Sequence, residues 1–144
     1  MSDSPSLTSA SRTPDGYQLL DIIGEGGMGV VWHARDLSLQ RDVAVKLLKP
    51  GVSPDSLAVQ RFLAEARLTG QLQHPGIPAV HELGTLPDGQ PFLAMKLVKG
   101  QNLHALLQQR PNASHDRGRF LAIFEQVCHA VGYAHAHGVI HRDL

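Results

Sequence analysis

The sequence predicts an α+β fold in which a five-stranded antiparallel sheet and one helix precede a separate helical segment. Three observations lead to this prediction. Residues 17–49 and 79–97 hold runs rich in β-branched and aromatic residues, separated by turn-forming residues. Residues 53–55 are Ser-Pro-Asp, a combination typical of a helix start. Beyond residue 119, apolar residues recur at helical spacing.

The expected strands fall into two groups. We expect three strands within residues 17–49, with breaks at 24–29 and around 36–40, and two more at 79–84 and 92–97. A Pro-Asp-Gly turn joins the last two, and these are residue types that turns prefer. The short connections favour antiparallel pairing of consecutive strands.

One helix is expected to begin at Ser53 and to run to about Gln73. Its apolar residues include Phe62 and Leu72, and a spacing of three places Glu65 on the same face as Phe62. A glutamate on an apolar face needs a cationic partner, because burying an unpaired charge is costly. We expect Lys46 to be that partner.

Beyond residue 100 the pattern becomes helical. A short helix is expected near residues 102–109, a polar loop at 110–117 and a long helix that ends near His137. Apolar residues three and four apart form one stripe along the long helix. They are Phe120, Phe124, Val127 and Val131, widened by Leu121 and Cys128. We therefore expect Cys128 to occupy a buried helical position.

Composition narrows the class of protein. Thirteen basic and 13 acidic side chains leave no net charge, so no overall field favours nucleic acid or a membrane surface. The single cysteine excludes an internal disulfide and suits a reducing cytoplasm, and no apolar run is long enough to span a bilayer. We expect a cytoplasmic protein without a membrane segment in this chain. Residues 1–16 are rich in Ser, Thr, Pro and Asp, which predicts a disordered leader.

A glycine-rich stretch precedes the second expected strand. Gly24, Gly26 and Gly29 lack a Cβ, so backbone N–H groups there can approach an anion such as a phosphate chain. A dinucleotide-binding turn has nearly the same glycine spacing but continues into a helix. The residues after Gly29 are β-branched and aromatic, which favours a hairpin loop over the dinucleotide-binding alternative.

The chain resembles the protein kinase family from residue 17 to its last residue. The glycines are followed by Val-Ala-Val-Lys at 43–46, which resembles the third strand of these enzymes with its lysine. Four more stretches resemble family motifs in the expected order: Glu65 of the C-helix, the turn at 74–77, the hinge strand at 92–98 and His-Arg-Asp-Leu at 141–144. The sequence Gly-Glu-Gly-Gly-Met-Gly is most similar to bacterial Ser/Thr kinases of the Hanks type.

The resemblance implies a kinase small lobe at residues 17–98, with the ATP-binding loop and the hinge, and the beginning of the large lobe at 99–144. The second segment would hold the D and E helices and the start of the catalytic loop. The family's two magnesium ligands would follow residue 144. The resemblance thus implies ATP and, in the full-length enzyme, Mg²⁺ as cofactors, and a protein Ser or Thr hydroxyl as acceptor. We expect little or no phosphoryl transfer from residues 1–144 alone.

The same resemblance implies roles for single residues. The loop glycines Gly24, Gly26, Gly27 and Gly29 would cover the phosphates of ATP. Lys46 would bind the α and β phosphates and Glu65 would hold it, while Asp143 would orient the acceptor hydroxyl. The adenine would contact Ile23, Val31, Ala44, the gatekeeper Met95, and the backbone of Lys96 and Val98. Of the nearby His135, His137 and His141, the first and last match structural histidines of the family, so we do not expect a zinc site.

An alternative remains open: a non-catalytic, pseudokinase-like module that binds nucleotide or docks on another kinase.

Overall fold

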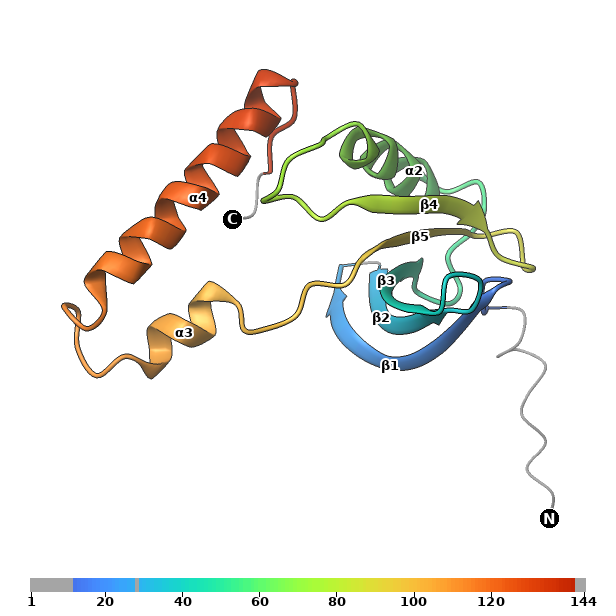
Figure 1. Cartoon of the computed structure of the whole chain (residues 1–144). Helices are drawn as coiled ribbons and strands as arrows, with labels where there is room; N and C mark the ends of the chain where they lie inside the picture. Colours follow the sequence, from blue (N-terminus) through green and yellow to red (C-terminus); the bar gives the residue numbers. More distant parts are fainter. Residues whose placement is uncertain (1–11, 28, 142–144) are drawn as a thin grey trace, which may run out of the picture. The chain divides into compact units, whose positions relative to one another are not determined.

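The computed structural model describes residues 12–27 and 29–141 (Figure 1). These residues divide into two compact units. We call the described part of residues 1–71 together with 79–97 the sheet unit, and the described part of 72–78 together with 98–144 the helical unit.

The sheet unit contains one five-stranded antiparallel sheet. Its strands are β1 (Tyr17–Gly26), β2 (Gly29–Asp36), β3 (Arg41–Leu48), β4 (Val80–Thr85) and β5 (Pro91–Lys96). The spatial order is β1-β2-β3-β5-β4, so β1 and β4 are the two edge strands. This arrangement confirms the predicted sheet and its antiparallel pairing.

The sheet is curled strongly enough for its two edge strands to meet through a side chain. The register of β1 against β2 shifts twice, after Leu19 and after Ile22, and such bulges increase strand bending and twist. The Tyr17 hydroxyl on β1 donates a hydrogen bond to Glu82 Oε2 on β4, at 2.6 Å. Burial, together with this hydrogen bond and the Glu82 charge, raises the pKa of Tyr17 well above its ordinary value.

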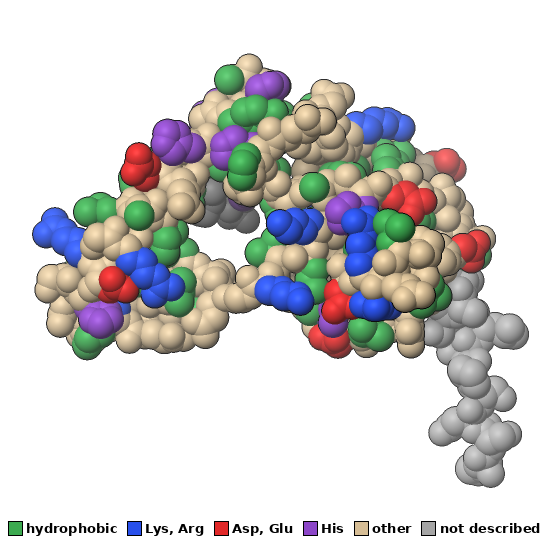
Figure 2. Space-filling model, viewed as in Figure 1, with side chains coloured by type: hydrophobic (Ala, Val, Ile, Leu, Met, Phe, Trp, Pro, Cys, Tyr) green, Lys and Arg blue, Asp and Glu red, His purple; other side chains and the backbone are tan. Residues whose placement is uncertain are grey.

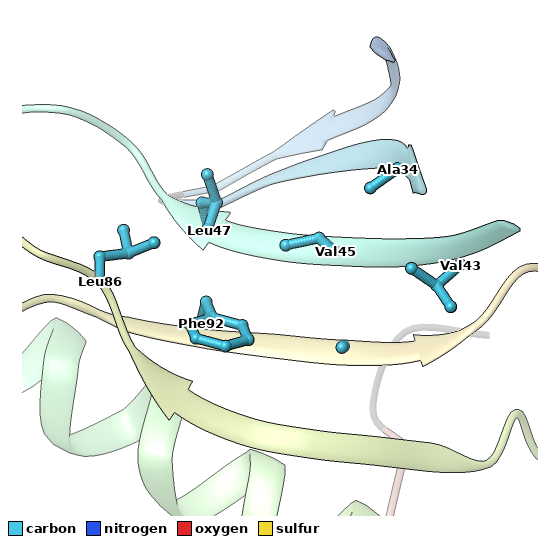
Figure 3. Packing of buried hydrophobic residues seen from close by; sticks show 7 residues of the cluster. Ala34, Val43, Val45, Leu47, Leu86 and Phe92 are labelled. Atoms are coloured by element: carbon cyan, nitrogen blue, oxygen red, sulfur yellow. The ribbon is translucent and has the colours of Figure 1, made fainter. Parts of the chain in front are cut away.

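The two faces of β3 supply two separate apolar clusters, because successive residues of a strand point to opposite sides. On one face, Val43, Val45 and Leu47 pack with residues from the neighbouring strands and the β4–β5 turn, as Figure 3 shows. These neighbours are Ala34, Leu86, Phe92 and Ala94. On the other face, Leu48 and Leu93 pack against the helix α2 (Leu57–Gly70).

The α2 helix begins later and ends earlier than the sequence predicts. Its N-cap is Ser56, whose Oγ accepts a hydrogen bond from the Val59 N–H at 3.4 Å. Ser53 instead begins a turn that precedes the helix, in which its carbonyl accepts a hydrogen bond from the Ser56 N–H at 3.0 Å. Leu72 lies beyond the helix end at Gly70, so it is not part of the helical face.

The prediction that Glu65 shares the buried face with Phe62 is wrong. The buried residues of α2 are Val59, Phe62 and Ala66, whereas Glu65 is exposed. Since helical residues are rotated by about 100° each, Ala66 lies about 40° to one side of Phe62 and Glu65 about 60° to the other. The helix turns the Ala66 side of Phe62 toward the sheet, which leaves Glu65 in solvent.

The described part of the expected leader, residues 12–16, packs on the sheet unit. Pro14 is fully buried. The Arg12 guanidinium donates to the Leu48 carbonyl and forms an ion pair with Asp88 Oδ2 at 3.5 Å. Residues 1–11, for which disorder was also expected, lie outside the described residues.

The helical unit contains α3 (Leu103–Gln109) and α4 (Arg117–Ala136), which agree with the predicted helices. Asn102 caps α3, because its Oδ1 accepts a hydrogen bond from the Ala105 N–H at 2.8 Å. The 72–78 segment contacts α4, where the Gln73 N–H donates to the Tyr133 hydroxyl at 3.0 Å. Within the described part of the chain, we find no helix with the length and apolar character needed to cross a membrane.

The stripe predicted along α4 is only partly covered, since Phe120, Val127 and Val131 are half-buried and Leu121, Phe124 and Cys128 are exposed. Ala130 is the buried residue of this helix, and Phe124 is 61% exposed. Cys128 is also exposed, so the prediction that it is buried is wrong. A single helix stripe is buried only where another element covers it, and the helical unit holds few elements to do so.

Candidate functional site

Four of the predicted site residues lie on one face of the sheet. Val31 is paired in register with Lys46, and Ala44 with Met95. Directly opposed residues on neighbouring strands point to the same side, and Ala44 and Lys46 are two apart on β3. The helix α2 packs on this face. Leu48 and Leu93 point to the same side of the sheet as Lys46, and both belong to the apolar cluster that includes the α2 residues.

The glycine-rich stretch forms the hairpin loop between β1 and β2. β1 ends at Gly26 and β2 begins at Gly29, and Gly27 has a positive φ of 50°. No helix follows Gly29, so the dinucleotide-binding alternative is excluded.

Gly29 lets the loop approach Lys46 closely. A Cβ placed on Gly29 would lie 3.1 Å from Lys46 Cε and 3.4 Å from the Leu47 carbonyl oxygen. The other two glycines of the motif are less crowded, since a Cβ on Gly24 would meet only Val31 at 3.8 Å and one on Gly26 would meet nothing within 4 Å. The lysine stem therefore runs directly beside the C-terminal end of the glycine loop.

The predicted adenine contacts are distributed less uniformly. Ile23 lies at the second register shift of β1 and is half exposed. Lys96 is paired with Val43, so its side chain belongs to the opposite face of the sheet from Ala44. The Lys96 N–H donates to the Ala79 carbonyl at 2.8 Å. Val98 belongs to the helical unit and is exposed. Within the sheet unit, the structure thus groups Val31, Ala44, Lys46 and Met95.

The structure does not contain the predicted ion pair between Lys46 and Glu65. No ion pair within 4 Å joins them, although both side chains belong to the described residues. The Lys46 Nζ instead lies 5.9 Å from the centroid of the Phe62 ring. The orientation of α2 explains this outcome, because it places Phe62 under the sheet and Glu65 in solvent.

The same face of the sheet also carries a cluster of charged side chains that the sequence analysis did not predict. On the strand pairs next to Ala44, His33 Nδ1 lies 3.1 Å from Asp21 Oδ1 and its Nε2 lies 3.4 Å from Asp42 Oδ2. The Arg35 guanidinium donates to Asp42 Oδ1 at 2.8 Å, and this bond, with His33, lowers the pKa of the Asp42 carboxyl. The polar alternation along β2 was the signal for it, but only the strand register shows that the four groups meet.

The remaining predicted residues divide into two cases. Asp143, the expected catalytic acid–base residue, lies outside the described residues. His137 stacks on Tyr133 at 4.2 Å between ring centroids, and its Nδ1 lies 2.8 Å from the Tyr133 carbonyl oxygen. In residues 12–27 and 29–141, no three His, Cys, Asp or Glu side chains gather in a geometry suited to a metal ion.

Surface charge shows no concentration of one sign on the face drawn in Figure 2. Basic and acidic side chains are interspersed there, in agreement with the zero net charge of the sequence. The face in view therefore offers no extended basic patch of the kind that binds a nucleic-acid backbone.

Comparison with known proteins extends these observations. A family model described as a protein kinase domain matches residues 17–144. Serine/threonine-protein kinase pkn3 of Myxococcus xanthus is 42% identical over 128 residues, which are 89% of this chain and 23% of the relative. Serine/threonine-protein kinase PknA of Mycobacterium tuberculosis is 42% identical over 132 residues, covering 89% of this chain and 30% of the relative. The chain thus spans less than a third of the length of these curated relatives.

A solved structure of a kinase domain matches the fold of this chain. The crystal structure of the Mycobacterium tuberculosis PknI kinase domain matches with a TM-score of 0.70 and 32% sequence identity. The match covers 94% of this chain and 54% of that chain. The family model and the two relatives agree with it, and we conclude that this chain belongs to the protein kinase family, with bacterial serine/threonine-protein kinases as its homologues.

Proposed function

We propose that residues 17–98 bind ATP as part of a serine/threonine protein kinase that transfers the γ-phosphate of ATP to a protein hydroxyl. One observation carries this proposal. The glycine loop approaches the Lys46 stem so closely that a Cβ on Gly29 would lie 3.1 Å from Lys46 Cε. A glycine loop whose backbone an anion can approach closely, with a lysine ammonium beside it, suits a polyphosphate.

The sheet face beside Lys46 fits the rest of the nucleotide. Val31 and Ala44 offer short aliphatic side chains, which suit the flat apolar surface of an adenine ring. We assign Ile23 to the same contact, and Met95 to the inner end of the adenine site as its gatekeeper. For the adenine edge we assign the backbone of Lys96 and Val98. The N–H of Lys96 is bonded to Ala79, so its carbonyl is the group we assign to the ligand.

The chemical step needs residues at the end of the chain. We assign Asp143 to orient the acceptor hydroxyl and to accept its proton, on the strength of its motif. We assign Glu65 as a partner of Lys46 in the nucleotide-bound state, on the strength of its motif. The described residues do not fit a magnesium site, since they hold no suitable carboxylate cluster, and we derive no step through the metal.

Titration of the 144-residue chain with ATP tests the proposal. We expect saturable binding that Lys46→Ala weakens at least about tenfold, because a charge-assisted contact to phosphate is worth roughly 1.5–3 kcal/mol. Lys49→Ala is the matched control, since Lys49 is three residues further along the chain and lies just beyond the end of β3 at Leu48. Equal affinity of the wild type and Lys46→Ala would refute the assignment of the site.

A second candidate is a module that binds nucleotide without turnover. The absence of a Lys46–Glu65 ion pair within 4 Å favours it, because active kinases need the corresponding pair in place. Phosphorylation of a generic protein substrate with radiolabelled ATP separates the two candidates. We expect little or no transfer by residues 1–144 alone, and turnover by a chain that continues through the magnesium ligands. ATP binding without turnover by that longer chain would support the second candidate.

A further inference from the structure

The Lys46 ammonium lies over the ring of a buried phenylalanine. Its Nζ is 5.9 Å from the Phe62 ring centroid, within the range at which a cation is attracted to an aromatic face. Among residues 12–27 and 29–141, Lys46 enters no ion pair or side-chain hydrogen bond that the structure records. The ring is therefore the group that the ammonium faces in this state.

We propose that Phe62 is a positioning residue for Lys46, and that its ring holds the ammonium ready for the phosphates of the nucleotide. The proposal rests on the function assigned above to Lys46. Phe62 acts only through the lysine and does not touch the nucleotide.

The ring is a rigid support because it is fixed on several sides. Phe62 is 7% exposed and packs with Leu48 of β3 and Leu93 of β5. Leu93 is paired in register with Lys46, so the ring lies under the strand residue that it supports. Cluster residues from α2 itself, Val59 and Ala66, hold the helix in the rotation that presents the ring.

The lysine stem is confined from the other side as well. Gly29 lies so close to Lys46 Cε that a Cβ there would be 3.1 Å away. A free lysine side chain loses roughly 1.5–2 kcal/mol of rotamer entropy when it is fixed, and a stem already confined has less to lose on binding. Confinement between Gly29 and Phe62 is therefore expected to favour nucleotide binding.

An aromatic ring suits this role because it carries no net charge. In the nucleotide-free state the ring faces one side of the ammonium, with Nζ 5.9 Å from the ring centroid, and leaves the charge and the three N–H donors of the ammonium available to phosphate. The exposed position of Glu65 is consistent with such a state of the nucleotide-free protein.

Fluorination of the Phe62 ring tests the proposal with little change in shape. Successive fluorine atoms weaken the negative potential of the ring face, so 4-fluoro-, 3,5-difluoro- and 3,4,5-trifluorophenylalanine at position 62 form a graded series. The first measurement is the rate at which an amine-directed ester acylates Lys46 in the 144-residue chain, read by mass spectrometry. Lys99, which is exposed, is the internal control in each sample.

The expected result is a graded one. Only the free amine is acylated, so a weaker ring should raise the Lys46 rate, by about 2- to 5-fold for the trifluoro ring, the range that an exposed cation–π contact allows. The rate at Lys99 should not change. The dissociation constant for ATP should rise by a similar factor across the same series. Phe62→Leu, which keeps an apolar side chain, should match or exceed the trifluoro variant in both measurements.

Two results would overturn the proposal. One is a Lys46 acylation rate that stays constant across the fluorinated series, and the other is an ATP affinity that does not fall as the number of fluorine atoms rises. A thermal unfolding midpoint measured for each variant separates these results from loss of the fold. Failure of the proposed function looks different, because the wild type would then bind no ATP while the acylation gradient persisted.

Discussion

The sheet unit and the helical unit differ in how much of their apolar surface they bury themselves. In the sheet unit, five of the eight residues of β3 are buried, and an apolar cluster forms on each of its two faces. In the helical unit, α4 is longer than any strand, yet Ala130 is its buried residue. One face of β3 is covered by α2 and the other by a second apolar cluster, whereas the α4 stripe lacks a neighbouring element that covers it to the same extent. Mutational sensitivity should therefore be concentrated in the sheet unit.

The largest difference is expected for phenylalanines of the two units. Phe92→Ala removes a ring that is 4% exposed, and should lower the free energy of unfolding by about 3–5 kcal/mol. Phe124→Ala, in the exposed stripe of α4, should change it by less than about 0.5 kcal/mol. Urea unfolding followed by the fluorescence of Trp32, the single tryptophan, reports on the sheet unit, and circular dichroism reports on the helices. Equal losses for both variants would mean that the stripe of α4 is covered in solution.

Two glycines sharpen the comparison with changes of opposite sign. A Cβ on Gly84 would lie 2.5 Å from the buried Phe92 ring, so Gly84→Ala should destabilise by about 1–3 kcal/mol. A Cβ on Gly132 of α4 would meet nothing within 4 Å, so Gly132→Ala should stabilise by about 0.4–1 kcal/mol. Thermal unfolding of the two variants beside the wild type provides the measurement. A destabilising Gly132→Ala would contradict the open surroundings of α4.

The start of α2 provides a smaller effect within the sheet unit. Ser56→Ala removes the N-cap hydrogen bond and should cost about 1 kcal/mol of stability. Ser53→Ala should be nearly neutral, because its backbone carbonyl and not its hydroxyl makes the turn before the helix. The two variants differ by one hydroxyl each, so urea midpoints compare them directly. A larger loss for Ser53→Ala would restore the helix start that the sequence suggests.

The smallest effect concerns pH and the β2–β3 turn. Asp36 accepts hydrogen bonds from the Ser38 hydroxyl and from the Ser38 and Leu39 N–H groups, and these lower the pKa of its carboxyl below the ordinary value of 3.8. A lowered folded-state pKa adds stability above the unfolded-state value, and this stability is lost as the pH falls through the folded-state pKa. Wild type should therefore lose more stability between pH 7 and pH 3 than Asp36→Asn. Parallel losses in urea titrations at the two pH values would rule out this contribution.

Much of the sheet could be predicted because its signals are local. The β-branched runs and the Gly24–Gly29 stretch determine where β1, β2 and β3 begin and end, within a few residues. The strand position of Lys46 on β3 followed from the same signals, whereas its proposed role came from the resemblance of the Val-Ala-Val-Lys stretch to a kinase motif. Alternation along β3 then groups Lys46 with Ala44 before any distance is known.

Other features were decided by contacts between distant residues. The sequence allows Glu65 to lie on either flank of the α2 stripe, and the packing of Ala66 against the sheet settles the rotation of the helix. The same packing places Phe62 under Lys46, which no spacing along the chain indicates. The stripe of α4 has a regular period, but its burial depends on what covers it, and Cys128 is exposed for that reason.

Taken by itself, the amino-acid order determined the strands, the glycine hairpin and the lysine behind it, because backbone preference and alternation act over a few neighbouring residues. Tertiary structure alone decided which group faces the Lys46 ammonium, because the rotation of a helix on a sheet depends on side chains that are far apart in the chain.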